Sequence, residues 1–353
     1  MGKKLFLFKR VILTIICILL IFSIGLLISN KFNSSYDDLN DVDKSILSQL
    51  DLYFKSEKKK EIWEGFKLSD KTIVAIDGIW KKAYVVNPKE NISYLFGTKI
   101  KMPKNSNLNV YRVSVLDPHV FSMRFDLGNF NTLNRQYDVY GKNSYYTRYN
   151  KEFVYAKNSS RHYITFLNHE SFHYYMQNNW ADGSRFLEDI KDSDIELIKN
   201  EYDVLSNIQS ELFKKSYEKD KLIKYAKEYV NIINKRKIQN PDYLKAELSM
   251  ETAEGSAEYV GIKASQCVGY DFGVMYFNNV SNVSFNKVIP LIKSKQLPIN
   301  FLSDRMPYET GALLCQLLDA LEIRDWQDRL NKQTIKNPLT LDMIISEYVD
   351  NVN

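Results

Sequence analysis

The chain has 353 residues, of which 44% are hydrophobic and 26% are charged, and its formal net charge is +5. This length suits one large domain or two modest ones and allows a sizeable buried core. Acidic and basic residues occur in mixed clusters such as 55–62, which argues against the concentrated basic patch of a nucleic-acid-binding protein, so we expect no nucleic-acid partner.

The N-terminal region contains an apolar run from Val11 to Ser29 without charge or proline. A run of about 18–20 such residues matches the hydrocarbon thickness of a bilayer. Four basic residues precede it: Lys3, Lys4, Lys9 and Arg10. The positive-inside rule then predicts a cytoplasmic tail over 1–10, a transmembrane anchor over 11–29 and an extracytoplasmic remainder. A cleaved signal peptide is the competing interpretation, although its apolar core is usually only about 7–15 residues long.

Residues 30–70 are expected to form a linker followed by a helical segment. Lys31–Asn40 is rich in Ser, Asn and Asp, a composition that is typical of loops. Asp41–Phe66 then places apolar residues at helical spacing. This pattern predicts one amphipathic helix or a pair of helices.

The remainder of the chain changes from strand-like to helix-like patterns. Residues 71–156 contain short β-branched and aromatic runs separated by Gly, Pro and Asn: 72–76, 83–86, 110–115 and 120–125. Residues 157–353 instead show helical periodicity over Tyr163–Asn179, Asp194–Arg236, Tyr243–Cys267 and Met306–Leu321. We therefore predict an α+β protein with an N-terminal transmembrane helix, a β-rich N-terminal part and a mainly α-helical domain.

The clearest chemical signal is the HExxH run His169-Glu170-Ser171-Phe172-His173. Helical residues four apart lie on one face with Cβ atoms about 5–6 Å apart, so the two imidazoles can bind one zinc ion. Glu170 projects toward the edge of that face, where its carboxylate can act as general base on a water that the zinc activates. A histidine pair without a metal is the alternative, but two of the four histidines fall inside this motif, which favours zinc.

A second acidic motif follows at 251–260, ETAEGSAEYV. A catalytic zinc ion needs a third protein ligand and an open position for water, and this segment offers several carboxylates. The two motifs together resemble the gluzincin zinc peptidases, in particular the aminopeptidase-like branch with an E-G-x-A-x-Y pattern. This resemblance implies that Glu254 is the third ligand and that Glu258 is the carboxylate that hydrogen-bonds a zinc-bound histidine. Glu251 is the alternative third ligand, and otherwise a residue that surrounds the ligands.

The resemblance also implies a zincin-like fold for the helical domain and hydrolysis of a peptide bond in a peptide or protein substrate. Gluzincins commonly bring a tyrosine or histidine to the developing oxyanion, and Tyr308 matches in position and type. Arg305 is a weaker candidate for binding a substrate carboxylate. The two motifs lie farther apart than in familiar gluzincins, so we interpret 181–242 as a helical insertion. Its pattern is compatible with a hairpin that packs beside the site and shapes a cleft or a lid.

Two other functions fit the same residues. One is a binding or sensing protein that keeps the zinc site without turnover, and the other is a non-peptide hydrolase such as a cell-wall enzyme. Glu170 argues against the first, because a purely structural site has no use for a base, while no wall-binding repeats are visible for the second. Cys267 and Cys315 of the exported part are able to form a disulfide or to remain buried thiols.

Overall fold

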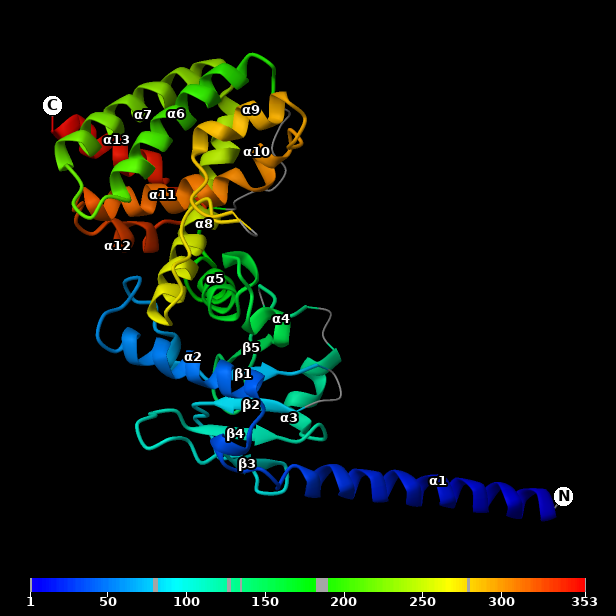
Figure 1. Ribbon diagram of the computed structural model, residues 1–353. Coiled ribbons are helices and arrows are strands. Elements are labelled where there is room, and N and C mark those ends of the chain that lie inside the picture. The colour runs from blue at the N-terminus through cyan, green and yellow to red at the C-terminus, as the bar shows by residue number, and fades with distance from the viewer. Residues whose placement is uncertain are drawn as a thin grey trace. The chain divides into compact units, whose positions relative to one another are not determined.

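The computed structural model describes residues 2–78, 82–125, 128–133, 135–181, 190–277 and 280–352. Two compact units divide the chain: Met1–Lys59 with Lys67–Val154, and Lys60–Phe66 with Tyr155–Asn353. The first unit contains a five-stranded sheet and the second is built from helices, which confirms the predicted α+β class (Figure 1). Residues 182–189 of the predicted insertion lie outside the described residues.

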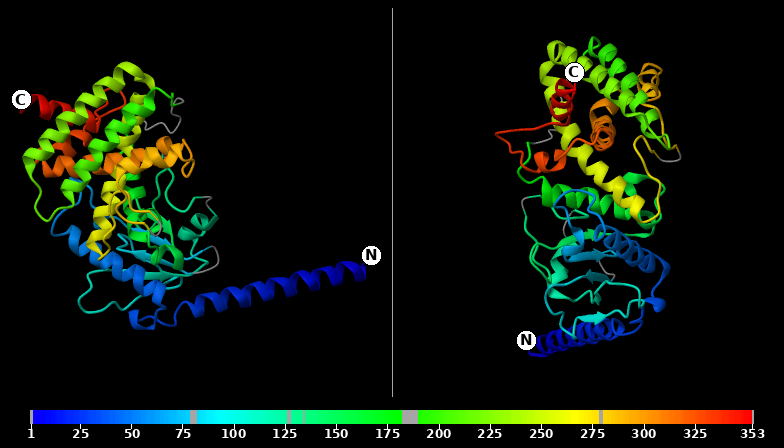
Figure 2. Two further views of the ribbon diagram at one scale, coloured as in Figure 1. Left: turned by 45° about the horizontal axis from the view of Figure 1, so that its top comes forward. Right: turned by 90° about the vertical axis from the view of Figure 1, so that its left-hand side faces the viewer.

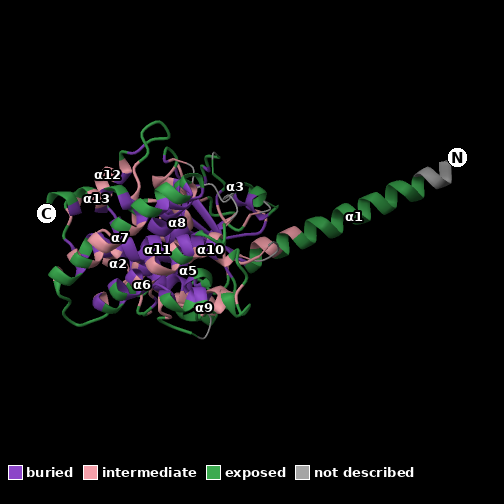
Figure 3. Cartoon of the chain, turned by 90° about the horizontal axis from the view of Figure 1, so that it is seen from above, coloured by how far each residue is buried: buried purple, intermediate pink, exposed green. Residues whose placement is uncertain are grey.

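The first unit begins with the apolar helix α1 (Gly2–Ser29). Its segment Phe6–Ser29 is long and apolar enough to cross a membrane, although a signal sequence passes the same test. The described side chains of α1 are exposed along most of its length (Figure 3). Exposure of so many large apolar side chains to water is unfavourable, and transfer into a hydrocarbon layer removes that cost.

The sheet has the strand order β3-β4-β2-β1-β5. Its strands are β1 (Ile73–Ile76), β2 (Ala83–Val86), β3 (Gly97–Lys99), β4 (Val110–Val113) and β5 (Tyr145–Arg148). All neighbouring strands are antiparallel except β1 and β5, which are parallel. Every residue of β1 and β2 is buried, in keeping with their uninterrupted apolar sequences.

Helix α2 (Asp41–Glu57) is attached to the sheet unit through a buried carboxylate. Asp43 accepts hydrogen bonds from the hydroxyl groups of Tyr84 (2.9 Å) and Tyr149 (2.7 Å). Asn40 caps the start of the helix, because its side chain accepts a hydrogen bond from the Asp43 backbone N–H. Of the helical range predicted over Asp41–Phe66, only Asp41–Glu57 forms a helix, and 58–66 is not helical.

One of the four predicted strand runs is wrong. The runs 72–76, 83–86 and 110–115 contain β1, β2 and β4, but 120–125 is helical, within α3 (Pro118–Phe121) and η3 (Ser122–Phe125). Asp117 accepts hydrogen bonds from two backbone N–H groups of the first turn, and Pro118 occupies the first helical position. These two residues start a helix and override the β-branched composition that follows.

The remaining short elements of the first unit are η1 (Tyr36–Asp38), η2 (Leu68–Asp70) and α4 (Lys151–Val154). The second unit contains η4 (Ser159–Arg161), α5 (Tyr163–Met176), α6 (Asp194–Leu212), α7 (Lys219–Gln239), α8 (Pro241–Cys267), η5 (Phe285–Lys287), α9 (Val288–Lys293), α10 (Phe301–Asp304), α11 (Met306–Ala320), α12 (Trp326–Asn331) and α13 (Leu341–Asn351). The region predicted to be helical over Asp194–Arg236 contains α6 and most of α7, in keeping with a helical hairpin.

Helix α8 is the centre of the second unit and contacts α5, α7, α11 and α13 (Figure 2). Two of its glycines allow the closest of these approaches. A Cβ atom at Gly255 would collide with the backbone of Gly311 on α11, and one at Gly261 would lie 2.9 Å from the carbonyl oxygen of Thr165 on α5. A side chain at either position would therefore push a whole helix away from α8.

An aromatic cluster holds the segment Lys60–Phe66 in the second unit. The Trp63 ring lies 4.8 Å from Phe172, 5.0 Å from Trp326 and 6.3 Å from Tyr259 between ring centroids. Phe172 belongs to the HExxH run and Tyr259 to the second motif, so this cluster packs the apolar positions of both motifs. Cys267 and Cys315 are both free thiols, and Cys315 is buried.

Candidate metal centre

Helices α5 and α8 carry the two motifs. Asn158 accepts a hydrogen bond from the Arg161 backbone N–H and so forms the turn that precedes α5, which then runs from Tyr163 to Met176. His169 and His173 lie one turn apart on α5, and Glu254 lies in the middle of α8. Gly261 lets α8 approach α5 closely enough for the carboxylate to reach the imidazoles.

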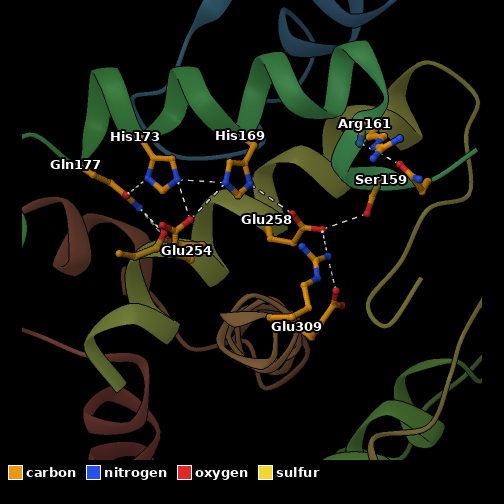
Figure 4. Close-up of polar contacts among 12 residues, drawn as sticks. Ser159, Arg161, His169, His173, Gln177, Glu254, Glu258 and Glu309 are labelled. Atoms are coloured by element: carbon orange, nitrogen blue, oxygen red, sulfur yellow. Dashed lines mark hydrogen bonds and ion pairs between the residues drawn. The ribbon is translucent and has the colours of Figure 1, made fainter. Parts of the chain in front are cut away.

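The three predicted ligands converge on one point (Figure 4). The Nε2 atoms of His169 and His173 lie 3.2 Å apart, and Glu254 Oε2 lies 3.5 Å from the first and 3.2 Å from the second. A tetrahedral zinc ion with bonds of about 2.0–2.1 Å separates its ligand atoms by roughly 3.3–3.4 Å. His169, His173 and Glu254 therefore form a largely buried group that could hold a metal ion.

The charges within this group balance through a proton. Burial alone lowers the pKa of His169, but hydrogen bonds to Glu254 and Glu258 and the nearby charge of Glu170 raise it to about 10. Burial raises the pKa of Glu254, yet its hydrogen bonds to His169 and His173 outweigh burial and hold it well below its usual range. A proton on an imidazole thus neutralises the buried carboxylate at a place where a divalent cation would do the same.

Glu258 orients the first imidazole. Its Oε2 atom lies 3.4 Å from His169 Nδ1, and a carboxylate in this position accepts the Nδ1–H hydrogen and leaves Nε2 facing Glu254. The other oxygen accepts from Ser159 Oγ at 3.2 Å and from the Arg305 guanidinium at 3.4 Å. Burial raises the pKa of Glu258, but Arg305 and His169 bring it down to about 2, so this carboxylate stays ionised.

Gln177 orients the second imidazole, and sequence reasoning missed this residue. Its Oε1 atom is hydrogen-bonded to His173 Nδ1, while its Nε2 atom donates to the Ala253 carbonyl (2.8 Å) and to Ser256 Oγ (3.0 Å). A backbone carbonyl only accepts hydrogen bonds, which fixes the amide orientation and requires His173 Nδ1 to be the donor. Both imidazoles therefore present Nε2 to the metal position. The only sequence signal was the spacing of Gln177, one turn after His173.

The two predicted catalytic residues lie next to His169. Glu170 follows it on α5, is half-buried, and acts on it through its charge. The Tyr308 ring, on α11, is nearly parallel to the His169 ring, with 10° between the planes and 5.9 Å between the centroids. Helix α11 thus brings the Tyr308 ring alongside one of the candidate metal ligands.

Two other candidates have different surroundings. Glu251 does not belong to the metal-binding group of the described residues, and its side chain is hydrogen-bonded to Thr310. Burial and the charge of Glu201 raise its pKa well above the usual range. The Arg305 guanidinium is paired with Glu258 and Glu309, so it positions Glu258 and is already engaged by two carboxylates.

The predicted insertion contributes the helices α6 and α7, which pack against each other. Arg236 of α7 pairs with Glu201 of α6 and with Glu247 of α8, and all three side chains are buried. This ion-pair network fixes the helical hairpin to the same helix that carries Glu254. The described part of the insertion is thus an integral part of the second unit.

Comparison of the chain with protein-family models, with curated proteins and with solved structures finds no match. The chemistry of the site therefore rests on its own residues and geometry.

Proposed function

We propose that this chain is a membrane-anchored zinc-dependent hydrolase, and specifically a peptidase of the gluzincin type with a zincin-like helical domain. One observation carries the proposal: the two imidazoles and the Glu254 carboxylate meet with separations of 3.2–3.5 Å. These separations match the edges of a tetrahedral zinc site, and the ligands come from an HExxH helix that also supplies Glu170.

The donor set supports a catalytic site more than a structural one. Structural zinc sites are usually closed by four protein ligands and are rich in cysteine, whereas catalytic sites use three protein ligands and keep one position open. The metal-binding group of the described residues has three members, two histidines and one glutamate. This composition is the one known for hydrolytic zinc sites that hold a water in the fourth position.

When bound, zinc supplies Lewis acidity and lowers the pKa of a water to near neutrality. Glu170 then accepts a proton from the attacking water and returns it to the leaving amine. The Tyr308 hydroxyl donates a hydrogen bond to the oxyanion that forms from the attacked carbonyl. Glu258 and Gln177 keep the Nδ1 atoms of His169 and His173 protonated, so that both Nε2 atoms remain ligands.

The proposed site of action is based on α1 and its flanking charges. We propose that α1 remains as an anchor, with its basic N-terminal end in the cytoplasm and both units outside it. The substrates would then be extracytoplasmic peptides or proteins. Protease treatment of intact cells tests this orientation: digestion of a tag at the C-terminus is expected, and protection of that tag would contradict it.

The catalytic proposal is tested with the full chain purified in detergent. Zinc content is measured by mass spectrometry and activity by cleavage of a diverse peptide library. Glu170→Gln is expected to keep its zinc but to lose activity by about 10²–10⁴, because the amide cannot accept the proton. Glu196→Gln, an exposed carboxylate on α6, serves as the matched control and is expected to keep both zinc and activity.

The outcomes separate the rival functions. Full activity in a zinc-loaded Glu170→Gln chain would remove the proposed base. A wild-type chain that binds zinc and cleaves no substrate would favour the binding or sensing function. Hydrolysis of cell-wall material in the absence of peptide cleavage would favour the non-peptide hydrolase.

A further inference from the structure

The end of α1 is fixed to the sheet by a buried arginine. Arg112 on β4 is 7% exposed, and its guanidinium donates to the carbonyl oxygens of Asn30 (2.8 Å), Asn33 (3.0 Å) and Phe32. These carbonyls belong to the residues directly after α1, where a cation also interacts favourably with the helix dipole. The junction between α1 and the sheet is therefore a specific structure.

Asn30 and Lys31 complete this junction from the other side. The Asn30 side-chain amide donates to the carbonyls of Phe96 (3.1 Å) and Arg112 (3.2 Å), and its oxygen accepts from Arg112 Nε (3.3 Å). The Lys31 ammonium donates to the carbonyl of Gly97 at 2.9 Å. The segment that the sequence predicted to be a linker thus begins as a part of the sheet unit. These hydrogen bonds hold the β3 edge against the end of α1.

Large exposed apolar side chains surround this junction. Phe32 is 65% exposed, Tyr94 83% and Leu95 53%, and we call these three residues the junction patch. The Lys31 ammonium lies 4.0 Å from the centre of the Tyr94 ring, which places the ring beside the end of α1. The adjoining segment 91–105 contains three exposed lysines and no acidic residue.

The length of α1 sets the depth of the patch in a bilayer. The candidate membrane span Phe6–Ser29 has 24 residues, and its uncharged part, Val11–Ser29, has 19. At about 1.5 Å per residue such a helix crosses a hydrocarbon core of roughly 30 Å and ends in the headgroup layer, which is about 5–8 Å thick on each side. Because Arg112 ties the following residues to the sheet, the junction patch is carried to the same depth.

We propose that the junction patch lies in the headgroup layer of a phospholipid bilayer, so that the sheet unit sits directly on the membrane surface. Aromatic side chains are favoured at this depth, with the ring toward the acyl chains and the hydroxyl toward water. The exposed lysines of 91–105 add positive charge, which favours an anionic membrane surface. The proposal needs α1 to span the bilayer but is independent of the metal centre.

The test uses the full chain in vesicles of phosphatidylcholine and phosphatidylglycerol that carry bromine at the top of the acyl chains. Tyr94→Trp introduces a fluorescent probe into the patch. Leu133→Trp is the matched control, because Leu133 is 56% exposed and follows Asn131, which is hydrogen-bonded to Tyr146 of β5 at the opposite edge of the sheet. Leu19→Trp reports whether α1 itself is inserted.

Fluorescence of the unsubstituted chain is subtracted from each measurement. The probes at Leu19 and Tyr94 are expected to lose fluorescence in brominated lipid, while the probe at Leu133 keeps it. Equal quenching of the probes at Tyr94 and Leu133 would overturn the proposal. Absence of quenching at Leu19 would overturn it as well, because α1 would then lie outside the bilayer.

Discussion

Helix α8 carries two buried carboxylate clusters whose counter-ions differ. In the first, Glu247 pairs with Arg236, which also pairs with Glu201. In the second, Glu254 faces the imidazoles of His169 and His173. Both clusters are buried, both join α8 to other helices, and only their cations set them apart.

This difference separates a cluster that contains a permanent cation from one that could hold a metal ion. A guanidinium is always charged, so the Arg236 cluster contains a permanent cation, while burial raises the pKa of Glu247 to about 7 and raises that of Glu201 as well. An imidazole is neutral unless it takes up a proton, so the Glu254 cluster is compensated only by a proton or by a metal ion. Of these two clusters, the one whose carboxylate faces two histidines is therefore the one that could hold a metal ion.

The largest expected effect concerns the ion-pair cluster around Arg236. Arg236→Met should lower the free energy of unfolding by about 3–5 kcal/mol, because two buried carboxylates lose their counter-ion. Urea unfolding of the detergent-solubilised chain measures this change. Arg329→Met removes the exposed ion pair with Glu347 and should cost only about 0–1 kcal/mol. Equal losses for the two variants would show that the Arg236 cluster does not hold the helices together.

The second prediction concerns the cluster of Glu254, His169 and His173. Zinc at about a thousand times its Kd should raise the stability of the wild type by about 4 kcal/mol, since it binds only the folded chain. Glu254→Gln should abolish this zinc-dependent gain, and Arg236→Met should retain it in spite of its lower starting stability. Thermal unfolding with and without zinc measures both. A Glu254→Gln chain that zinc still stabilises would break the distinction between the clusters.

A third prediction tests Tyr308 as the proposed hydrogen-bond donor to the oxyanion. Tyr308→Phe should lower kcat by about 10²–10³ while zinc content stays unchanged, because only a hydrogen bond to the oxyanion is removed. Tyr217→Phe, at an exposed tyrosine, is the matched control and should leave kcat unchanged. Loss of zinc from Tyr308→Phe would instead show that the hydroxyl group helps to hold the metal site, because phenylalanine keeps the ring that faces His169.

The smallest effect is expected at Gln177. Gln177→Leu should weaken zinc binding about 10–100-fold, because His173 loses the partner that holds its Nδ1–H group. Competition with a chelating dye measures the affinity. Gln177→Glu restores an acceptor and should recover much of the binding, which a purely steric role would not explain. Unchanged affinity in Gln177→Leu would remove Gln177 from the support of the site.

The sequence by itself determined the features that depend on neighbours along the chain. The helices that carry the two motifs, the one-turn spacing of His169 and His173, and the apolar helix at the N-terminus all follow from local periodicity. A helical repeat has the same geometry in any protein, so these predictions needed no knowledge of packing.

Only the tertiary structure decided which distant groups meet. Glu254 and not Glu251 joins the histidines because the packing of α8 against α5, which Gly261 permits, selects one face of α8. Gln177 is a partner of His173 because the fold places its side-chain amide between His173 and the Ala253 carbonyl. The same holds for the Arg112 junction, since contacts between residues far apart in sequence depend on packing that no local pattern encodes.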